Sequence, residues 1–176
     1  LGRSWSAELS KTTAVYSVGA SIVHFNAPAL VAATGALPTH ELISVGGNVK
    51  LGDFRPYVAY YKSDLDPTVA GRLTQKNRIL DLGLEWAGYS QMRFRANYVD
   101  DKGTALNGIA GRDGKKRTLV ASAEYFLSKR TSLNAAVFNN RFSDGYKLEA
   151  NNLAALSRDP NASSVTGYSA GIVHTF

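Results

Sequence analysis

Apolar and polar residues alternate along most of this chain, with the period of a β-strand that has unlike surroundings on its two faces. In residues 78–88, leucines and Trp86 fall on one face, and Asp81 and Glu85 fall on the other. Residues 91–99 alternate in the same way. The pattern predicts eight strands of about ten residues each, which is enough for a tilted strand to cross a bilayer. They lie at 14–26, 40–51, 55–64, 78–88, 91–99, 117–127, 132–142 and 164–176.

Short and long connections alternate between these predicted strands. The short turns are Gly-Asp-Phe at 52–54, Gly-Tyr-Ser at 88–90 and Ser-Lys-Arg-Thr at 128–131. The long connections lie at 27–39, 65–77, 101–116 and 143–163. In outer-membrane barrels the short turns face the periplasm and the long loops face outside. The sequence therefore predicts an all-β fold, a transmembrane antiparallel up-and-down β-barrel, as one domain over residues 1–176.

Bulk composition does not separate this barrel from a soluble domain. The chain is 44% hydrophobic with a mean hydropathy of -0.16, and a barrel looks weakly hydrophobic because only alternate residues face lipid. No run of about eighteen apolar residues is present, so no transmembrane helix is expected. The net charge of +6 favours an anionic partner. The loop pattern points to lipid or permeating ions, and no nucleic-acid partner is expected.

The final predicted strand carries the most specific pattern. Tyr168, Ile172 and His174 share one face, and the chain ends on Phe176. Together with the Leu-Ser-Lys-Arg-Thr segment at 127–131, this ending resembles Gram-negative general (diffusion) porins, especially the betaproteobacterial type. The resemblance implies that these four residues form the signal recognised by the barrel-assembly machinery during biogenesis.

The resemblance implies a homotrimer in the outer membrane, in which each subunit is a water-filled channel for passive diffusion of small hydrophilic solutes and ions. Porins of this kind have sixteen strands, so we expect this chain to be the C-terminal half of such a barrel. Residues 4–9 are then the end of strand eight. The alternative is a complete small eight-stranded barrel, packed inside and non-conducting, with a structural or adhesion role.

Charged residues on the polar face of the predicted strands are the candidate pore lining. If Phe94 and Tyr98 face lipid, Arg93 and Arg95 point into the lumen, and Glu85 is expected opposite Arg93. The residues predicted to line the pore are Lys50, Lys62, Asp81, Glu85, Arg93, Arg95 and Glu124. A row of basic groups would favour anions, whereas mutual pairing of the charges would cancel that preference.

The long connections are basic, with cations at Arg72, Lys76, Arg112, Lys115, Lys116 and Arg117. Three interpretations stay open: a solvated loop surface without a specific partner, which is the default, contact with lipopolysaccharide phosphates, and funnelling of anions toward the pore. The three histidines share no metal-ligand spacing, so no metal site and no cofactor are expected. No Ser/His/Asp grouping suggests catalysis, and the chain is not expected to be an enzyme.

Overall fold

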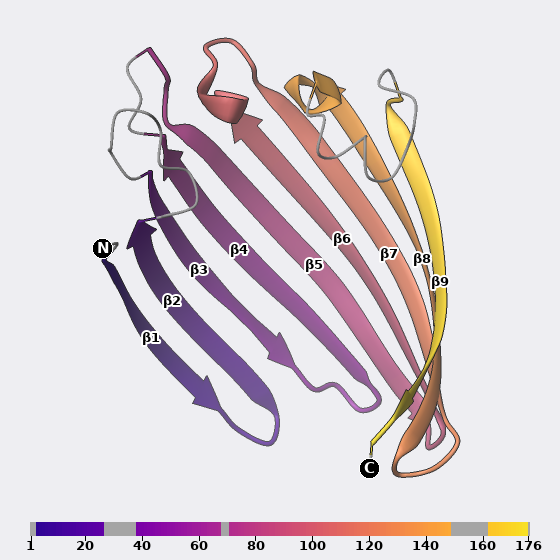
Figure 1. Ribbon diagram of the computed structural model, residues 1–176. Helices are drawn as coiled ribbons and strands as arrows, with labels where there is room; N and C mark the ends of the chain where they lie inside the picture. The colour runs from indigo at the N-terminus through magenta and orange to yellow at the C-terminus, as the bar shows by residue number, and fades with distance from the viewer. Residues whose placement is uncertain (1–2, 27–37, 68–70, 149–161, 176) are drawn as a thin grey trace.

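The computed structural model describes residues 3–26, 38–67, 71–148 and 162–175. These residues form one antiparallel sheet of nine strands, whose order in space is their order in sequence (Figure 1). The strands are β1 Ser4–Thr12, β2 Tyr16–Asn26, β3 Thr39–Val49, β4 Phe54–Asp66, β5 Gln75–Tyr89, β6 Met92–Thr104, β7 Gly114–Phe126, β8 Thr131–Asp144 and β9 Ser164–His174. Two 3-10 helices, η2 Leu106–Gly108 and η3 Gly145–Leu148, follow β6 and β8. The predicted up-and-down order of antiparallel strands is therefore confirmed.

The clearest differences between the structure and the predicted strand bounds lie at two places. Residues 4–9, expected as the end of a strand, belong to β1, which pairs with β2 along its whole length. Strands β6 and β7 also extend well into the predicted loop at 101–116, to Thr104 and back to Gly114. Polar residues at this end of the strands continue the backbone ladder without the apolar alternation, so the sequence pattern ended too early. The predicted loops at 27–39 and 143–163 lie mostly outside the described residues.

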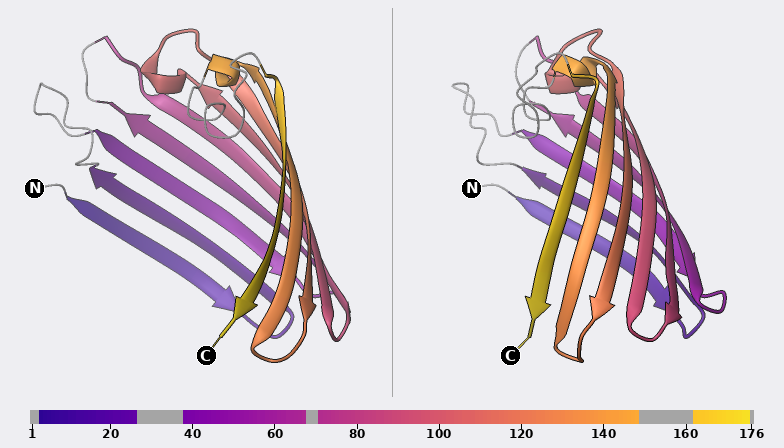
Figure 2. Two further views of the ribbon diagram at one scale, coloured as in Figure 1. Left: turned by 45° about the vertical axis from the view of Figure 1, so that its right-hand side comes forward. Right: turned by 90° about the vertical axis from the view of Figure 1, so that its right-hand side faces the viewer.

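The sheet is a single curved layer (Figure 2), and its two faces carry different kinds of side chain. Alternation places large apolar side chains on the convex face, where they are exposed to the surroundings. They include Val18, Val45, Val58, Leu80, Leu82, Leu84, Tyr98, Leu119, Leu133, Val137, Tyr168 and Ile172. A soluble monomer rarely exposes an apolar surface this extensive, whereas a membrane barrel presents such a band to lipid. None of the described residues belongs to a helix long and apolar enough to cross a membrane.

A small core lies on the concave face at the end of the sheet that carries the long connections. Leu106, Phe142, Tyr146 and Val165 are buried together there. The side chain of Asn77 donates to Asp101 Oδ1 (2.9 Å) and to the Tyr146 hydroxyl (2.6 Å). The Tyr146 hydroxyl in turn donates to Asp101 Oδ2 (2.7 Å). We call these six residues the mouth cluster; they fold the connections after β6 and β8 back over the concave face.

Gly103 makes room for this cluster. It lies on the concave face of β6, and a Cβ there would come within 2.5 Å of Leu106 Cδ2 and 3.1 Å of the Tyr146 hydroxyl. Any larger residue would push the cluster away from the sheet, so the glycine permits the close approach.

The two edges of the sheet are strands β1 and β9. Among the described residues β1 pairs only with β2, and β9 pairs only with β8. In an up-and-down sheet of nine strands the first and last run in the same direction (Figure 1). The described strands thus form an open sheet with two parallel edges.

Candidate functional site

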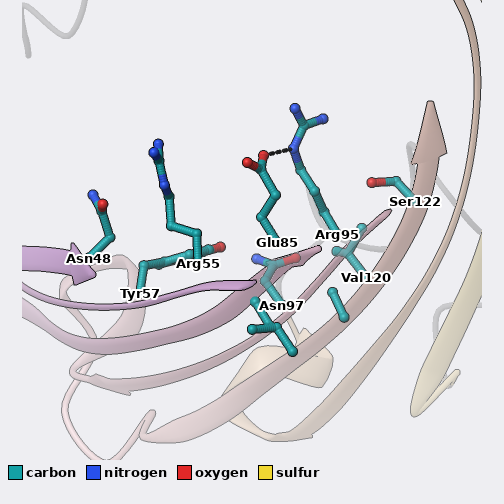
Figure 3. Close-up of a pocket in the computed structure, with 10 residues that line it drawn as sticks. Asn48, Arg55, Tyr57, Glu85, Arg95, Asn97, Val120 and Ser122 are labelled. Atoms are coloured by element: carbon teal, nitrogen blue, oxygen red, sulfur yellow. Dashed lines mark hydrogen bonds and ion pairs between the residues drawn. The ribbon is translucent and has the colours of Figure 1, made fainter. Parts of the chain in front are cut away.

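The concave face carries a hollow of about 300 Å³ across strands β3 to β7, in the half of the sheet nearer the short turns. Its side chains extend from the sheet toward the concave side (Figure 3). They are Asn48, Arg55, Tyr57, Glu85, Arg95, Asn97, Val120 and Ser122, and Leu84 and Ala96 complete the lining. Most of these side chains are hydrogen-bonding or charged groups, which is what a water-filled lumen requires of its wall.

Strand register brings the charged residues of this wall together. Glu85 on β5 lies directly opposite Arg55 on β4 and Arg95 on β6. A β-bulge between Trp86 and Tyr89 shifts the register near the turn, where Tyr89 pairs with Met92. The predicted opposition of Glu85 and Arg93 is therefore wrong, because the tight turn lies at Ser90 and Gln91 and not around Tyr89, and the bulge then adjusts the pairing by one residue.

Two glutamates and two arginines form a connected set of charges, which we call the waist network: Glu85, Arg93, Arg95 and Glu124. Glu85 Oε2 lies 2.9 Å from Arg95 Nε and 3.7 Å from Arg93 Nε. Arg95 Nη1 also lies 3.5 Å from Glu124 Oε2, and Glu124 accepts a hydrogen bond of 3.0 Å from Ser132. The alternation of sign along the network leaves it formally neutral.

Arg93 is the less exposed arginine of the waist network. Its guanidinium lies 5.3 Å from the centroid of the Phe126 ring, within cation–π range. Its register partner is Glu124 on β7. These contacts tie Arg93 to the wall, whereas the Arg95 side chain is 46% exposed and reaches the hollow.

Arg55 stands apart from the waist network. It is exposed on the concave face, and no ion pair joins it to a carboxylate among the described residues. Beside it, the Tyr57 ring lies over Gly83 of the neighbouring strand, where a Cβ would collide with the ring. Arg55 is therefore a cation of the wall that forms no ion pair within the described part of the sheet.

Of the other predicted lining residues, Asp81 and Glu124 lie on the concave face, and Asn97 donates to Asp81 at 3.4 Å. Lys50 follows the last residue of β3 and lies in the short turn, at the edge of the wall. Lys62 is the predicted lining residue that does not lie on the concave face.

Lys62 lies on the convex face, so the prediction that it lines the lumen is wrong. Its register partners are Ile43 and Arg78, and its ammonium lies 3.1 Å from Asp64 and 3.5 Å from Glu41. Near the long connections the residues of the convex face lie beyond the apolar band, and several of them are charged. A charge at that level therefore does not identify the lumen side.

The sequence prediction missed Arg55, Tyr57, Asn97 and Ser122 as members of the wall. In strand β4 both faces carry aromatic residues, so alternation alone could not assign the sides. A usable signal was Phe54, which begins the apolar row that continues through Val58 on the convex face. Counting from it would have placed Arg55 and Tyr57 on the concave face.

The residues of the predicted assembly signal lie on β9. Tyr168, Ile172 and His174 share its convex face, as their spacing indicated, with Tyr168 81% and Ile172 65% exposed. His174 Nδ1 lies 2.9 Å from the Thr131 hydroxyl. Phe176 lies outside the described residues. Within the described ranges no group of three or more histidines and carboxylates is arranged to hold a metal ion.

Comparison with known proteins agrees with this geometry. The model of the Gram-negative porin family matches residues 3–145. Among solved structures, OmpT (in-vitro folded), an outer membrane protein of Vibrio cholerae, is similar with a TM-score of 0.72 at 14% sequence identity. The likeness covers 98% of this chain and 55% of that structure, so the chain spans little more than half its length. No curated protein sequence matches. The chain therefore belongs to the Gram-negative porin family, and its sheet is that of a β-barrel of the bacterial outer membrane.

Proposed function

We propose that this chain forms part of the wall of a water-filled channel, through which small hydrophilic solutes and ions diffuse passively across the outer membrane. The observation that carries the proposal is the contrast between the two faces of the sheet. The convex face is apolar and exposed, while the concave face presents Arg55, Glu85, Arg95, Asn97 and Ser122 around one hollow. A non-conducting small barrel would fill this side with packed side chains.

The open sheet supports the proposal that the complete barrel has more strands than the nine described ones. The edges β1 and β9 run in the same direction, so joining them directly would create a parallel pair, which bacterial single-chain barrels avoid by having an even number of strands. Backbone groups of an open edge cannot remain unpaired in lipid. We therefore propose that further strands close the barrel, with this chain as the C-terminal half of a sixteen-stranded porin.

The proposal extends to assembly and subgroup. We propose a homotrimer of betaproteobacterial type, supported by membership of the Gram-negative porin family and by the ending Tyr168 to Phe176. The trimer would appear as a slowly migrating, heat-sensitive band when the full-length protein is run unheated on a denaturing gel. A single monomer band under mild extraction would contradict the trimer.

We propose a weak preference for anions. The waist network is formally neutral, so it contributes little to the mean potential of the wall. Arg55 adds a positive charge that forms no ion pair with a carboxylate of the described wall. Aspartates elsewhere on the concave face, such as Asp81, reduce this preference for anions. The channel is therefore expected to pass both anions and cations.

The proposal is tested by reversal potentials of the full-length porin in planar bilayers under a potassium chloride gradient. Arg55→Gln should lower the ratio of chloride to potassium permeability, and Glu85→Gln should raise it. Each shift should be roughly two- to threefold, because one charge several ångströms from an ion in water contributes about kT. Arg130→Gln, in the short turn, is the control with the same charge change as Arg55→Gln.

Two outcomes would contradict the proposal. A protein that inserts without conducting would favour the small structural barrel. A strong cation preference in the unmodified protein would exclude the anion preference but leave the channel itself in place.

A further inference from the structure

A cluster of four cations lies on the convex face, outside the pore wall. Lys102 of β6, Lys115 and Arg117 of β7 and Arg141 of β8 gather on this face, and all four are exposed. Asp100 is the one carboxylate on the convex face beside them in the described parts of β6 to β8. We call the four cations the convex cationic patch.

The strand register opposes like charges within this patch. Lys102 is the direct partner of Lys115, and Arg117 is the direct partner of Arg141. Like charges directly opposite one another destabilise an antiparallel pair. Two such pairs side by side are unfavourable in the protein alone, so the arrangement suits a bound anion that would screen both.

Ion pairs within the protein neutralise only part of the positive charge of the patch. Asp100 lies 3.2 Å from Arg117 Nε and 3.8 Å from Lys102 Nζ. Neither Lys115 nor Arg141 has an ion pair with any carboxylate of the described residues. One carboxylate for four cations leaves a formal charge of +3, and the side chains of Lys102 and Arg117 remain 60% and 54% exposed.

The level of the patch along the strands is that of the membrane surface. On β6 Lys102 lies four residues beyond Tyr98, on β7 Arg117 lies two residues before Leu119, and on β8 Arg141 lies four residues beyond Val137. These are the last large apolar residues of the convex face on their strands. The patch lies toward the long connections, which face outside in outer-membrane barrels.

We propose that the convex cationic patch binds the phosphate groups of lipopolysaccharide in the outer leaflet. Arginine and lysine side chains form strong charge-assisted hydrogen bonds with phosphate oxygens, and basic clusters at the edge of an apolar band recognise anionic headgroups. The proposal rests on the outer-membrane location and not on channel activity.

The same geometry separates lipid binding from anion funnelling. Lys116 lies between Lys115 and Arg117 in sequence but faces the concave side. Its ammonium lies 4.0 Å from Asp101 and 5.7 Å from the centroid of the Tyr146 ring. The Lys-Lys-Arg run is thus divided, with one lysine toward the pore mouth and its two neighbours toward the lipid.

The test measures binding of purified lipid A, the phosphorylated anchor of lipopolysaccharide, to the full-length porin by native mass spectrometry in detergent. The variant Lys115→Gln/Arg141→Gln breaks both opposed pairs and removes no internal ion pair. It should weaken lipid A binding about tenfold or more, at roughly 1 kcal/mol per cation. The control Lys129→Gln/Arg130→Gln removes the same charge from the short turn at the other end and should bind as the unmodified protein does.

Two further probes identify the ligand. Dephosphorylated lipid A should bind weakly to every variant, and inorganic phosphate should not compete at concentrations similar to lipid A. Equal binding by the Lys115→Gln/Arg141→Gln variant and the control, or by dephosphorylated lipid A, would overturn the proposal. Competition by inorganic phosphate at such concentrations would also overturn it, since the patch would then be a general anion site.

A stability measurement provides an independent check. Without lipid the Lys115→Gln/Arg141→Gln variant should melt at the same or a higher temperature than the unmodified protein, because repulsion is relieved. Saturating lipid A should raise the melting temperature of the unmodified protein more than that of the variant, because a ligand stabilises the state that binds it. An equal rise in both would contradict binding at this patch.

Discussion

The three arginines of the pore wall differ in how their charge is balanced. Arg93 and Arg95 share Glu85 and Glu124, whereas Arg55 has no carboxylate partner in the described wall. The pairs are partly exposed, and exposed ion pairs add little to stability. The pairs keep charged groups extended from the wall with little net charge, while Arg55 adds one positive charge that is in no ion pair.

At the same scale, Tyr146 joins the mouth cluster through its hydroxyl. Tyr146→Phe removes a donor to Asp101 and an acceptor for Asn77, both of which are buried. We expect a loss of about 1–3 kcal/mol in local stability, because buried polar groups are left without this partner. Hydrogen exchange of residues 105–113 should speed up accordingly, whereas Tyr60→Phe on the convex face should leave it unchanged. Equal exchange in both variants would show that the hydroxyl is dispensable.

Within each strand, side-chain direction alternates reliably, but the chemistry of each face changes along its length. The convex face of β4 runs from Phe54 through Val58 and Tyr60 to Lys62 and Asp64. Its middle suits lipid, and its end suits an aqueous or headgroup layer. The lumen side must therefore be assigned from the middle of a strand, where lipid enforces the contrast.

Neighbouring residues of β7 provide a matched test of the faces. Ala121 lies on the convex face within the apolar band, and Val120 lies on the concave face, near the middle of the strand. Ala121→Arg should destabilise the folded barrel by about 2–4 kcal/mol, the cost of an arginine near the bilayer midplane. Val120→Arg should fold normally and change the conductance. Urea unfolding in lipid vesicles measures both, and the opposite order would reverse the assignment of faces.

For the whole molecule, the fold has almost no core within the described residues. The mouth cluster is its one buried apolar group there, so a single-layer sheet must gain its stability from the bilayer and from closure into a barrel. The convex apolar band and the parallel edges β1 and β9 agree with this requirement.

Closure predicts the behaviour of the edge strands in the full-length porin. Amides of β1 that do not bond to β2, and amides of β9 that do not bond to β8, should exchange with deuterium as slowly as those of central strands. The physical reason is that a closed barrel pairs every strand on both sides. Hydrogen exchange by mass spectrometry with peptide resolution measures this, and fast exchange confined to β1 and β9 would indicate an open sheet.

The sequence by itself determined the class of fold, because alternation and loop length are local properties. A two-residue period predicts strands and their faces without knowledge of neighbours, and the order of short and long connections predicts the up-and-down topology. It also placed Tyr168, Ile172 and His174 on one face. Strand ends were less well predicted, as β1 and β6 show, because polar ladder residues have no periodic signal.

Only the tertiary structure decided which charges meet. The turn at Ser90 and Gln91, together with the bulge near Trp86, placed Arg95, and not Arg93, opposite Glu85, and the pairing of β4 with its neighbours placed Lys62 on the convex face. Register depends on pairing between strands, and one inserted residue changes every partner beyond it. The division of Lys115, Lys116 and Arg117 between lipid and pore mouth has the same origin, since a run of like charges acquires its separate roles only from the sheet that holds it.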